Sequence, residues 1–188
     1  MSFVLNKKGV HEVHHHTSLT KPCDTELEIF LNEVKNLVGK RNDVKILIIG
    51  SSPELRELAA KLNVKTTVVA NDLEVIERTT KLMNIKNKNE EWLEGDILKL
   101  PLTKRSFDII LSDYILSNVP PYNKESFYKR IKELLKKEGY VLIRSIVFKK
   151  TAKIFESKIS RHFRILEKKF GKTGIFSEYF PIYLMKPK

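Results

Sequence analysis

The chain has 188 residues, 41% of them apolar, and a formal net charge of +12. This length favours one domain with a sizeable core. The chain shows neither an apolar run of about 18 residues nor the apolar core of a signal peptide. We therefore expect a cytoplasmic protein without a membrane span. The one cysteine, Cys23, excludes an intramolecular disulfide and a cysteine-based zinc site.

The N-terminal segment predicts an arm followed by a helix. Residues 1–22 have no helical or strand periodicity and contain a histidine cluster, so we predict a flexible arm, with one domain over residues 23–188. The helix has Thr25 and Glu28 as a capping box and ends near Gly39. Its expected apolar face comprises Leu27, Phe30, Val34 and Leu37.

Strands and helices alternate over the predicted core, residues 44–147. The run Val44 to Ile49 is apolar throughout, which is typical of a strand buried on both faces of a parallel sheet. The other predicted strands are Thr66 to Ala70, a short strand before Gly95, Phe107 to Ser112 and Tyr140 to Val147. Three helices are predicted between these strands, each from apolar residues at helical spacing, and the last of them is expected to end at Gly139. The apolar positions are Leu55, Leu58, Ala59 and Leu62 in the first helix, Leu73, Ile76, Thr80 and Met83 in the second, and Phe127, Ile131, Leu134 and Leu135 in the third. This alternation predicts a three-layer α/β fold with a mainly parallel sheet.

The segment 148–188 carries most of the net charge. Residues 149–188 include eleven Lys or Arg and three Glu. Apolar residues at helical spacing predict one amphipathic basic helix that covers a face of the sheet, followed by one or two short strands within 175–185. A solvated helix face is the simplest interpretation, and an RNA, acidic-substrate or membrane-surface patch is the alternative. The apolar positions are Phe155, Ile159, Phe163, Leu166 and Phe170.

The turn after the first strand suggests a ligand site. In open α/β sheets the ligand lies beyond the carboxyl ends of the strands, next to the first strand–helix turn. Ser52 is suited to cap the following helix and Pro53 to begin it, which leaves free N–H groups for an anionic ligand group. The turn lacks G-x-G-x-x-G, and the chain has no Walker loop, so NAD, FAD and phosphate-loop binding are disfavoured.

Two aspartates follow the next strands. Asp72 comes 22 residues after Gly50, where a carboxylate accepts hydrogen bonds from a ribose diol. Asp96 follows the third strand and suits an adenine amino group. A helix cap or a turn residue explains each aspartate equally well.

Several blocks together resemble a known family. "ILIIG", "VVANDLEVIERT", "EGDILKLPLTKRSFDIILSDYILSNVP" and "YKRIKELLKKEGYVLI" are similar to class I S-adenosylmethionine-dependent methyltransferases of the small-molecule type, from about Val44 to Ser145, and "YLMKPK" resembles their last strand. Gly50 to Leu55 resembles a G-x-x-P-E-L variant of the cofactor loop. The resemblance implies a Rossmann-like α-β-α sandwich with an antiparallel C-terminal strand, S-adenosyl-L-methionine as cofactor and a small-molecule methyl acceptor.

The resemblance also implies which residues meet the cofactor. They are Gly50, Ser51 and Ser52 at the methionine end, Asp72 and Leu73 at the ribose, Asp96 and Ile97 around the adenine, and Ser112 and Asp113 beside the sulfonium. Methyl transfer from a sulfonium mainly requires alignment of the reacting atoms, and a base is needed only for a protonated acceptor. The candidate bases are Asp113, Tyr114 and His15.

Two motifs and two alternative functions complete the predictions. The stretch His11 to His15 satisfies H-E-x-x-H, but it lacks helical apolar periodicity and a third ligand, so we predict no metal site. "NVPPY", residues 118–122, resembles the N-P-P-Y loop of amino-group methyltransferases but is interrupted by Val119, and we interpret it as the loop before the next helix.

Two alternative functions remain for the protein as a whole. It could be an RNA methyltransferase that uses the basic tail, or a catalytically silent methyltransferase-like protein that binds a partner.

Overall fold

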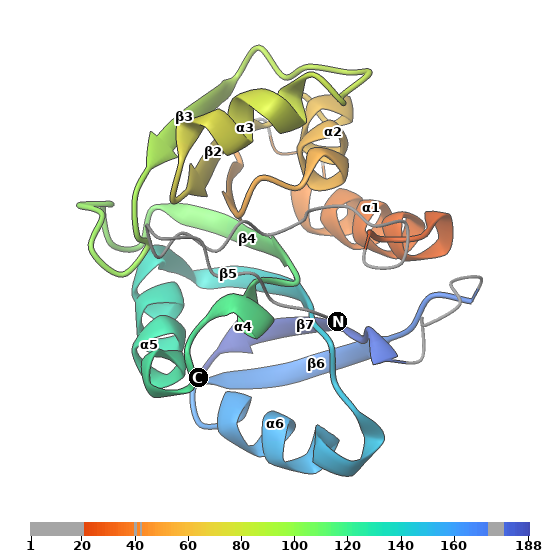
Figure 1. The fold of residues 1–188 in the computed structure, drawn as a ribbon, viewed down its shortest axis with the longest axis vertical. Coiled ribbons are helices and arrows are strands. Elements are labelled where there is room, and N and C mark those ends of the chain that lie inside the picture. Colours follow the sequence, from red (N-terminus) through yellow and green to blue (C-terminus); the bar gives the residue numbers. More distant parts are fainter. Residues whose placement is uncertain (1–20, 40, 42, 173–178) are drawn as a thin grey trace, which may run out of the picture.

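The computed structural model describes residues 21–39, 41, 43–172 and 179–188, and shows one seven-stranded sheet with helices on both faces (Figure 1). The strands are β1 Lys45–Ile49, β2 Lys65–Ala70, β3 Glu90–Glu94, β4 Phe107–Asp113, β5 Leu135–Arg144, β6 Phe163–Lys169 and β7 Ile182–Pro187. The helices are α1 Asp24–Val38, α2 Pro53–Lys61, α3 Leu73–Thr80, α4 Ile115–Asn118, α5 Lys124–Leu134 and α6 Ala152–Ile159, with 3-10 turns η1 Pro121–Asn123 and η2 Lys149–Thr151.

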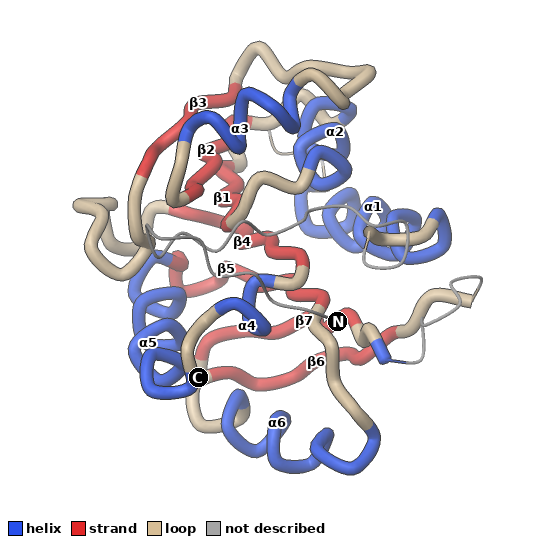
Figure 2. Tube along the Cα trace, viewed as in Figure 1, coloured by secondary structure: helices blue, strands red, loops and turns tan. Residues whose placement is uncertain are grey.

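The sheet has the strand order β3-β2-β1-β4-β5-β7-β6 (Figure 2). Strands β1 to β5 pair in parallel, β7 is antiparallel to β5, and β6 is antiparallel to β7. This topology confirms the predicted Rossmann-like sandwich with its mainly parallel sheet and antiparallel C-terminal strand. The predicted strands within the core are also confirmed, apart from the bounds of β5.

Two apolar cores hold the three layers together. On one face, Phe30 of α1, Leu55 of α2 and Ile76 of α3 pack with Ile46 and Ile48 of β1. The other face buries apolar residues of α4, α5, α6 and β6 against the alternate residues of the same strands. Strand β1 is therefore covered on both sides, which explains its continuous apolar sequence.

The cap of α1 differs from the predicted one. The predicted box paired Thr25 with Glu28, whereas the backbone N–H of the N-cap Cys23 donates to Glu26 Oε2 at 2.9 Å. Thr25 Oγ1 instead accepts the backbone N–H of Lys172 at 2.8 Å, so that its side chain ties the helix to the loop after β6.

The prediction that Gly139 ends a helix is wrong, because Gly139 lies inside β5. Helix α5 stops at Leu134, and β5 begins at the next residue. The pairing with β4 jumps from Phe107–Leu135 to Ile109–Tyr140, which leaves an irregular segment. A Cβ on Gly139 would lie 2.9 Å from Leu135 Cδ2. Because glycine has no side chain, the backbone at Gly139 can pack this closely against the Leu135 side chain.

The single basic helix predicted after residue 148 is wrong in its second half. Helix α6 ends at Ile159, which is buried in the core as predicted, and β6 begins at Phe163 and pairs with β7. Leu166 and Phe170, which the helical spacing placed on the apolar face, are 39% and 42% exposed. Backbone pairing with β7 satisfies the hydrogen bonds of this segment and overrides its helical periodicity.

Several predictions fall outside the described residues. These are the histidine-containing arm up to residue 20, with its H-E-x-x-H motif and His15, and the first part of the predicted final strands, residues 175–178. Within the described part of the chain, no helix is both long and apolar enough to cross a membrane. The division into an arm and one domain stays a prediction.

Candidate functional site

The strand order places a switch point between β1 and β4. The chain runs outward from β1 through β2 to β3, and then returns to the other side of β1 as β4 (Figure 1). Ile49 pairs with Ser112, and the buried Ser112 hydroxyl donates to the Ile49 carbonyl oxygen at 3.2 Å. Gly50 comes directly after β1, and Asp113 is the last residue of β4. Each follows one member of the pair Ile49–Ser112, so the two residues are neighbours at the carboxyl edge. This is where open α/β sheets bind their ligands.

The turn after β1 keeps its backbone open. Gly50 has φ +98°, and a Cβ built there would meet nothing within 4 Å. Ser52 caps α2 by accepting the N–H of Leu55 at 3.4 Å, as predicted, and its hydroxyl donates to Glu54 Oε2 at 3.0 Å. Gly50 thus leaves space beside the backbone, while Ser52 and Glu54 brace the start of the helix. Ser51 lies half-buried between these residues.

Asp72 and Asp96 follow β2 and β3 at the same edge. Asp72 Oδ1 accepts the N–H of Glu74 at 2.8 Å as the N-cap of α3, and its second oxygen has no hydrogen bond to any described residue. Asp96 Oδ1 accepts the N–H of Leu98 at 2.9 Å. Both carboxylates are therefore held by local caps and keep an oxygen for a ligand. Their neighbours Leu73 and Ile97 pack against the two cores.

Asp113 belongs to a buried charge cluster. Its Oδ1 accepts Nη1 of Arg144 at 2.9 Å, and Arg144 Nε lies 3.1 Å from Glu26 Oε2. The side chains of Asp113, Arg144 and Glu26 are 7%, 2% and 2% exposed. Two carboxylates thus share one guanidinium at the ends of β4 and β5 and the start of α1. We call these three residues the Asp113 cluster.

Burial dominates the electrostatics of Asp113. Desolvation raises the pKa of its carboxyl group to about 6, the nearby Arg144 opposes this increase, and the charges of Glu54 and Glu26 add to it. Asp113 is therefore ionised at neutral pH and titrates just below it. The charge of Glu54, in the first turn of α2, therefore acts on Asp113 together with that of Glu26.

Tyr114 follows in a strained conformation. Its φ is +60°, in the left-handed region that residues with a Cβ seldom adopt, and its N–H donates to the Arg144 carbonyl oxygen at 2.9 Å. Its ring centroid lies 6.0 Å from that of Phe180, and the Arg144 guanidinium lies 4.2 Å from the same Phe180 ring. Strain of this kind is common at functional sites.

Sequence reasoning missed Glu26, Arg144 and Phe180. Arg144 interrupts the apolar run "YVLIRSIV" at the end of a predicted strand, and a charge in that position was a usable signal for a buried partner. Glu26 carried no such signal, because it lies in a helix rich in acidic residues. Its meeting with Arg144 depends on how α1 docks.

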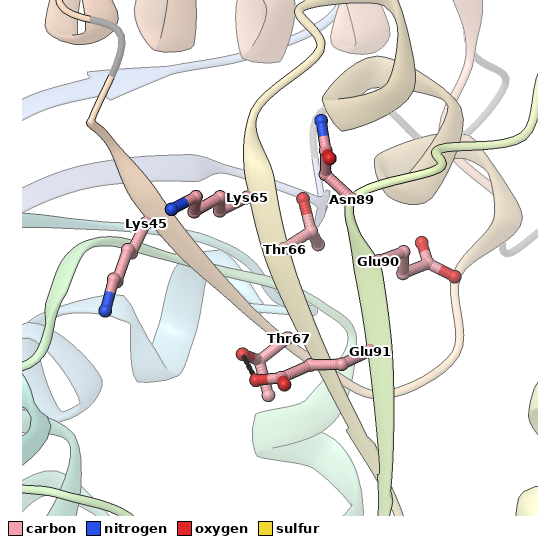
Figure 3. A pocket seen from close by; sticks show the side chains of 7 residues that line it. All are labelled: Lys45, Lys65, Thr66, Thr67, Asn89, Glu90 and Glu91. Carbon is pink, nitrogen blue, oxygen red and sulfur yellow. Dashed lines mark hydrogen bonds between the residues drawn. The ribbon is translucent and has the colours of Figure 1, made fainter.

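A hollow of about 350 Å³ lies at the amino-terminal edge of β1, β2 and β3, the edge opposite to that of the candidate site (Figure 3). Its polar groups are largely paired: the Thr67 hydroxyl donates to Glu91 Oε1 at 2.5 Å, and Glu90 accepts Arg56 Nη2 at 2.6 Å. These contacts indicate a structural role. The lining residues are Lys45, Lys65, Thr66, Thr67, Asn89, Glu90 and Glu91.

Comparison with known proteins gives a family for the chain. A family model described as a methyltransferase domain matches residues 50–173, which is more than half of the chain. No curated protein sequence matches the chain.

Solved structures share the fold at low sequence identity. The N-methyltransferase NodS from Bradyrhizobium japonicum WM9, solved in complex with S-adenosyl-L-homocysteine, has 15% identity and a TM-score of 0.67 over 87% of this chain and 88% of that chain. A TehB-like SAM-dependent methyltransferase from Corynebacterium glutamicum has 16% identity and a TM-score of 0.58 over 86% and 98%. The 4+2 cyclase SpnF has 10% identity and a TM-score of 0.66 over 85% and 80%. Because this last protein is named for a different reaction, the fold alone does not identify the chemistry.

Proposed function

We propose that this chain, which belongs to the methyltransferase-domain family, transfers a methyl group from S-adenosyl-L-methionine to a small-molecule acceptor. The observation that carries this proposal is the open space beside Gly50 at the switch point, at the same edge of the sheet as Asp72 and Asp113. The similarity to NodS, which was solved with S-adenosyl-L-homocysteine, supports the choice of cofactor.

The residues at the carboxyl edge fit such a cofactor. Gly50 lets a ligand approach the backbone, and the N-terminus of α2 offers N–H groups to the methionine carboxylate. The unpaired oxygen of Asp72 suits a ribose hydroxyl. Asp96, whose second oxygen has no hydrogen bond to a described residue, and the buried Ile97 would frame the adenine. The predicted role of Ser112 is indirect in this arrangement, because its hydroxyl bonds to the β1 backbone.

The chemistry asks for alignment more than for acid–base catalysis. When bound, S-adenosyl-L-methionine supplies a methyl group on a sulfonium that an acceptor attacks in line. Asp113, ionised at neutral pH, would accept a proton from the acceptor or orient it, and Arg144 fixes the direction of its carboxylate. Tyr114, the next residue in the chain, has its ring 6.0 Å from that of Phe180.

A small acceptor is supported by the size and charge of the surroundings. Between β4 and α5 the chain has only α4 and η1, with no inserted recognition domain. Part of the basic surplus of the C-terminal segment is neutralised locally, since Lys168 pairs with Glu156 at 2.6 Å and Lys169 with Glu167 at 2.6 Å. Lys186 pairs with Glu138 in the same way.

Calorimetric titration with S-adenosyl-L-homocysteine tests the cofactor site. Asp72→Asn is expected to weaken binding about tenfold, because it removes a charged acceptor from the ribose. Asp43→Asn is the matched control: its side chain is 78% exposed and it precedes β1 at the opposite edge, so binding stays unchanged. Equal effects of the two substitutions would contradict the assignment of Asp72.

The acceptor class is tested with radiolabelled methyl donor. Transfer to members of a small-molecule panel, with none to RNA, supports the proposal. Transfer to RNA that weakens steeply with salt would favour the RNA alternative. Binding of neither cofactor nor product would favour the silent, partner-binding alternative.

A further inference from the structure

The carboxyl edge of the sheet is acidic in a chain whose net charge is +12. The charges of Glu26 and Glu54 both act on Asp113, and within the described part of the chain Arg144 pairs with two of these three carboxylates, those of Glu26 and Asp113. One Glu26 oxygen, Oε1, is buried without a hydrogen-bond partner among the described residues. The three carboxylates and Arg144 together therefore carry a net negative charge at neutral pH.

This negative charge adjoins the open turn. Gly50 and Asp113 continue the paired strands β1 and β4. On the other side, Glu54 is held toward the turn by the Ser52 hydroxyl at 3.0 Å and is close enough to Asp113 to influence its titration. Two residues with carboxylates, Glu54 on α2 and Asp113 on β4, are thus neighbours of this turn along the chain and across the sheet.

The anchors of the cofactor indicate where its sulfur falls. The sulfur atom joins the ribose to the methionine chain. If Asp72 at the end of β2 holds the ribose and the turn after β1 receives the methionine carboxylate, then the sulfur lies between them, at the end of β1. Strand β4 is the neighbour of β1 on the far side from β2, and Asp113 is its last residue, one position after the Ser112 that pairs with Ile49.

We propose, resting on the proposed function above, that Asp113, Glu54 and the Glu26–Arg144 pair hold a net negative charge beside the sulfonium, so that the pocket binds S-adenosyl-L-methionine more tightly than S-adenosyl-L-homocysteine. The two ligands share the adenosine and amino-acid groups and differ by one methyl group and one positive charge. A carboxylate beside the sulfur stabilises only the charged ligand. Loss of the methyl group then weakens binding and favours release of the product.

In this arrangement Arg144 is a positioning residue. It holds the Asp113 carboxylate at 2.9 Å and lies against the Phe180 ring at 4.2 Å. Its single positive charge also balances one of the two buried negative charges that it contacts. This lowers the free-energy cost of keeping both carboxylates ionised. Selectivity for the sulfonium therefore depends on a charge that Arg144 stabilises but does not cancel.

Calorimetric titration with each ligand, at about pH 7.5, tests the proposal. Asp113→Asn is expected to lower the affinity for S-adenosyl-L-methionine roughly tenfold and to leave that for S-adenosyl-L-homocysteine unchanged, the effect of one partly screened charge. Asp72→Asn is the matched control, because the ribose is common to both ligands: it weakens both equally and leaves their affinity ratio unchanged.

A pH series on the unmodified chain gives a second measurement that needs no variant. The charged groups facing Asp113 are Arg144 on β5, Glu26 on α1 and Glu54 on α2, and its neighbour Tyr114 faces Phe180. Because the pKa of Asp113 is about 6, lowering the pH from about 7.5 to about 5 protonates it, and the affinity ratio falls toward that of Asp113→Asn. In that variant the ratio changes little over the same range.

The outcomes separate this inference from the proposed function. If both ligands bind and the ratio is the same in the unmodified chain and in Asp113→Asn, the inference is overturned while the cofactor site stands. If neither ligand binds, the cofactor site and the inference both fail. If Asp113→Asn does not fold, Glu26→Gln and the pH series decide the question, and an unchanged ratio in both overturns the inference.

Discussion

Replacing Asp113 with Asn is expected to stabilise the protein at neutral pH, although it removes an ion pair. Arg144 contacts two buried carboxylates, so that after the substitution it still pairs with Glu26 and the cluster becomes neutral. In the unmodified chain the second carboxylate is desolvated without full compensation, which is why its pKa rises to about 6.

The magnitude follows from the pKa of Asp113. An increase from 3.8 to about 6 is roughly two pK units, or about 3 kcal/mol of free energy of unfolding. Because the folded state binds the proton more tightly than the unfolded state, this contribution to stability is fully present below about pH 4. It is lost as the pH rises through about 6. Asn resembles the protonated side chain at every pH, so the advantage of the variant develops over the same interval.

Urea unfolding from about pH 4 to about pH 8 measures this difference. We expect equal free energies of unfolding at the acid end and an advantage of about 3 kcal/mol for Asp113→Asn at the neutral end. For a chain of this size the melting temperature would rise by about 6 to 12 °C. Taking the difference between the two proteins cancels the titration of the other groups. A variant that is less stable at neutral pH would refute the reasoning and show that the pair with Arg144 outweighs desolvation.

Three further substitutions test the structural argument by urea unfolding and ligand titration. Arg144→Met leaves the carboxylates of Glu26 and Asp113 buried without a cation and should cost about 3 to 5 kcal/mol, whereas a loss below about 1 kcal/mol would mean that water reaches them. Arg56→Ala removes a buried guanidinium that joins α2 and α3 to β3 and should also cost about 3 to 5 kcal/mol; a neutral result would contradict its structural role. Gly50→Ala forces a side chain to φ +98° and should cost about 1 kcal/mol and abolish S-adenosyl-L-homocysteine binding, and retained binding would show that the open turn is dispensable.

The parallel core was predictable because its signals are local. A strand covered by helices on both faces must be apolar at every position, and Leu47 and Ile48 of β1 show this in opposite cores. The helix starts were equally local, since Ser52 and Asp72 make their caps within three residues. These features depend on short stretches of sequence and not on how distant segments meet.

The errors occur where distant pairing decides the structure. The segment beginning at Phe163 has helical spacing of apolar residues, yet it pairs with β7 as an edge strand. Gly139 has the sequence signature of a helix end, yet it serves a close approach to Asp108 in the neighbouring strand. In both cases the partner lies outside the window in which periodicity is read.

Some residues of the candidate site could be predicted from the local sequence, and others depend on how distant segments pack. Gly50, Asp72, Asp96 and Asp113 follow predicted parallel strands, whose carboxyl ends share one edge, so their grouping follows from the order of the elements. Glu26 joins them only because α1 docks beside the end of β5. Its role required the packing of elements more than 100 residues apart in the chain.

The stability and binding arguments oppose one another at Asp113. A carboxylate that raises the free energy of the folded chain at neutral pH is disfavoured unless the charge serves a purpose, since Asn would fit the same space. The strained Tyr114 beside it carries a similar cost. Two unfavourable features in adjacent residues, at the switch point of the sheet, are accounted for together if this edge binds a cation. A sulfonium beside Asp113 would restore the charge balance that Arg144 leaves incomplete.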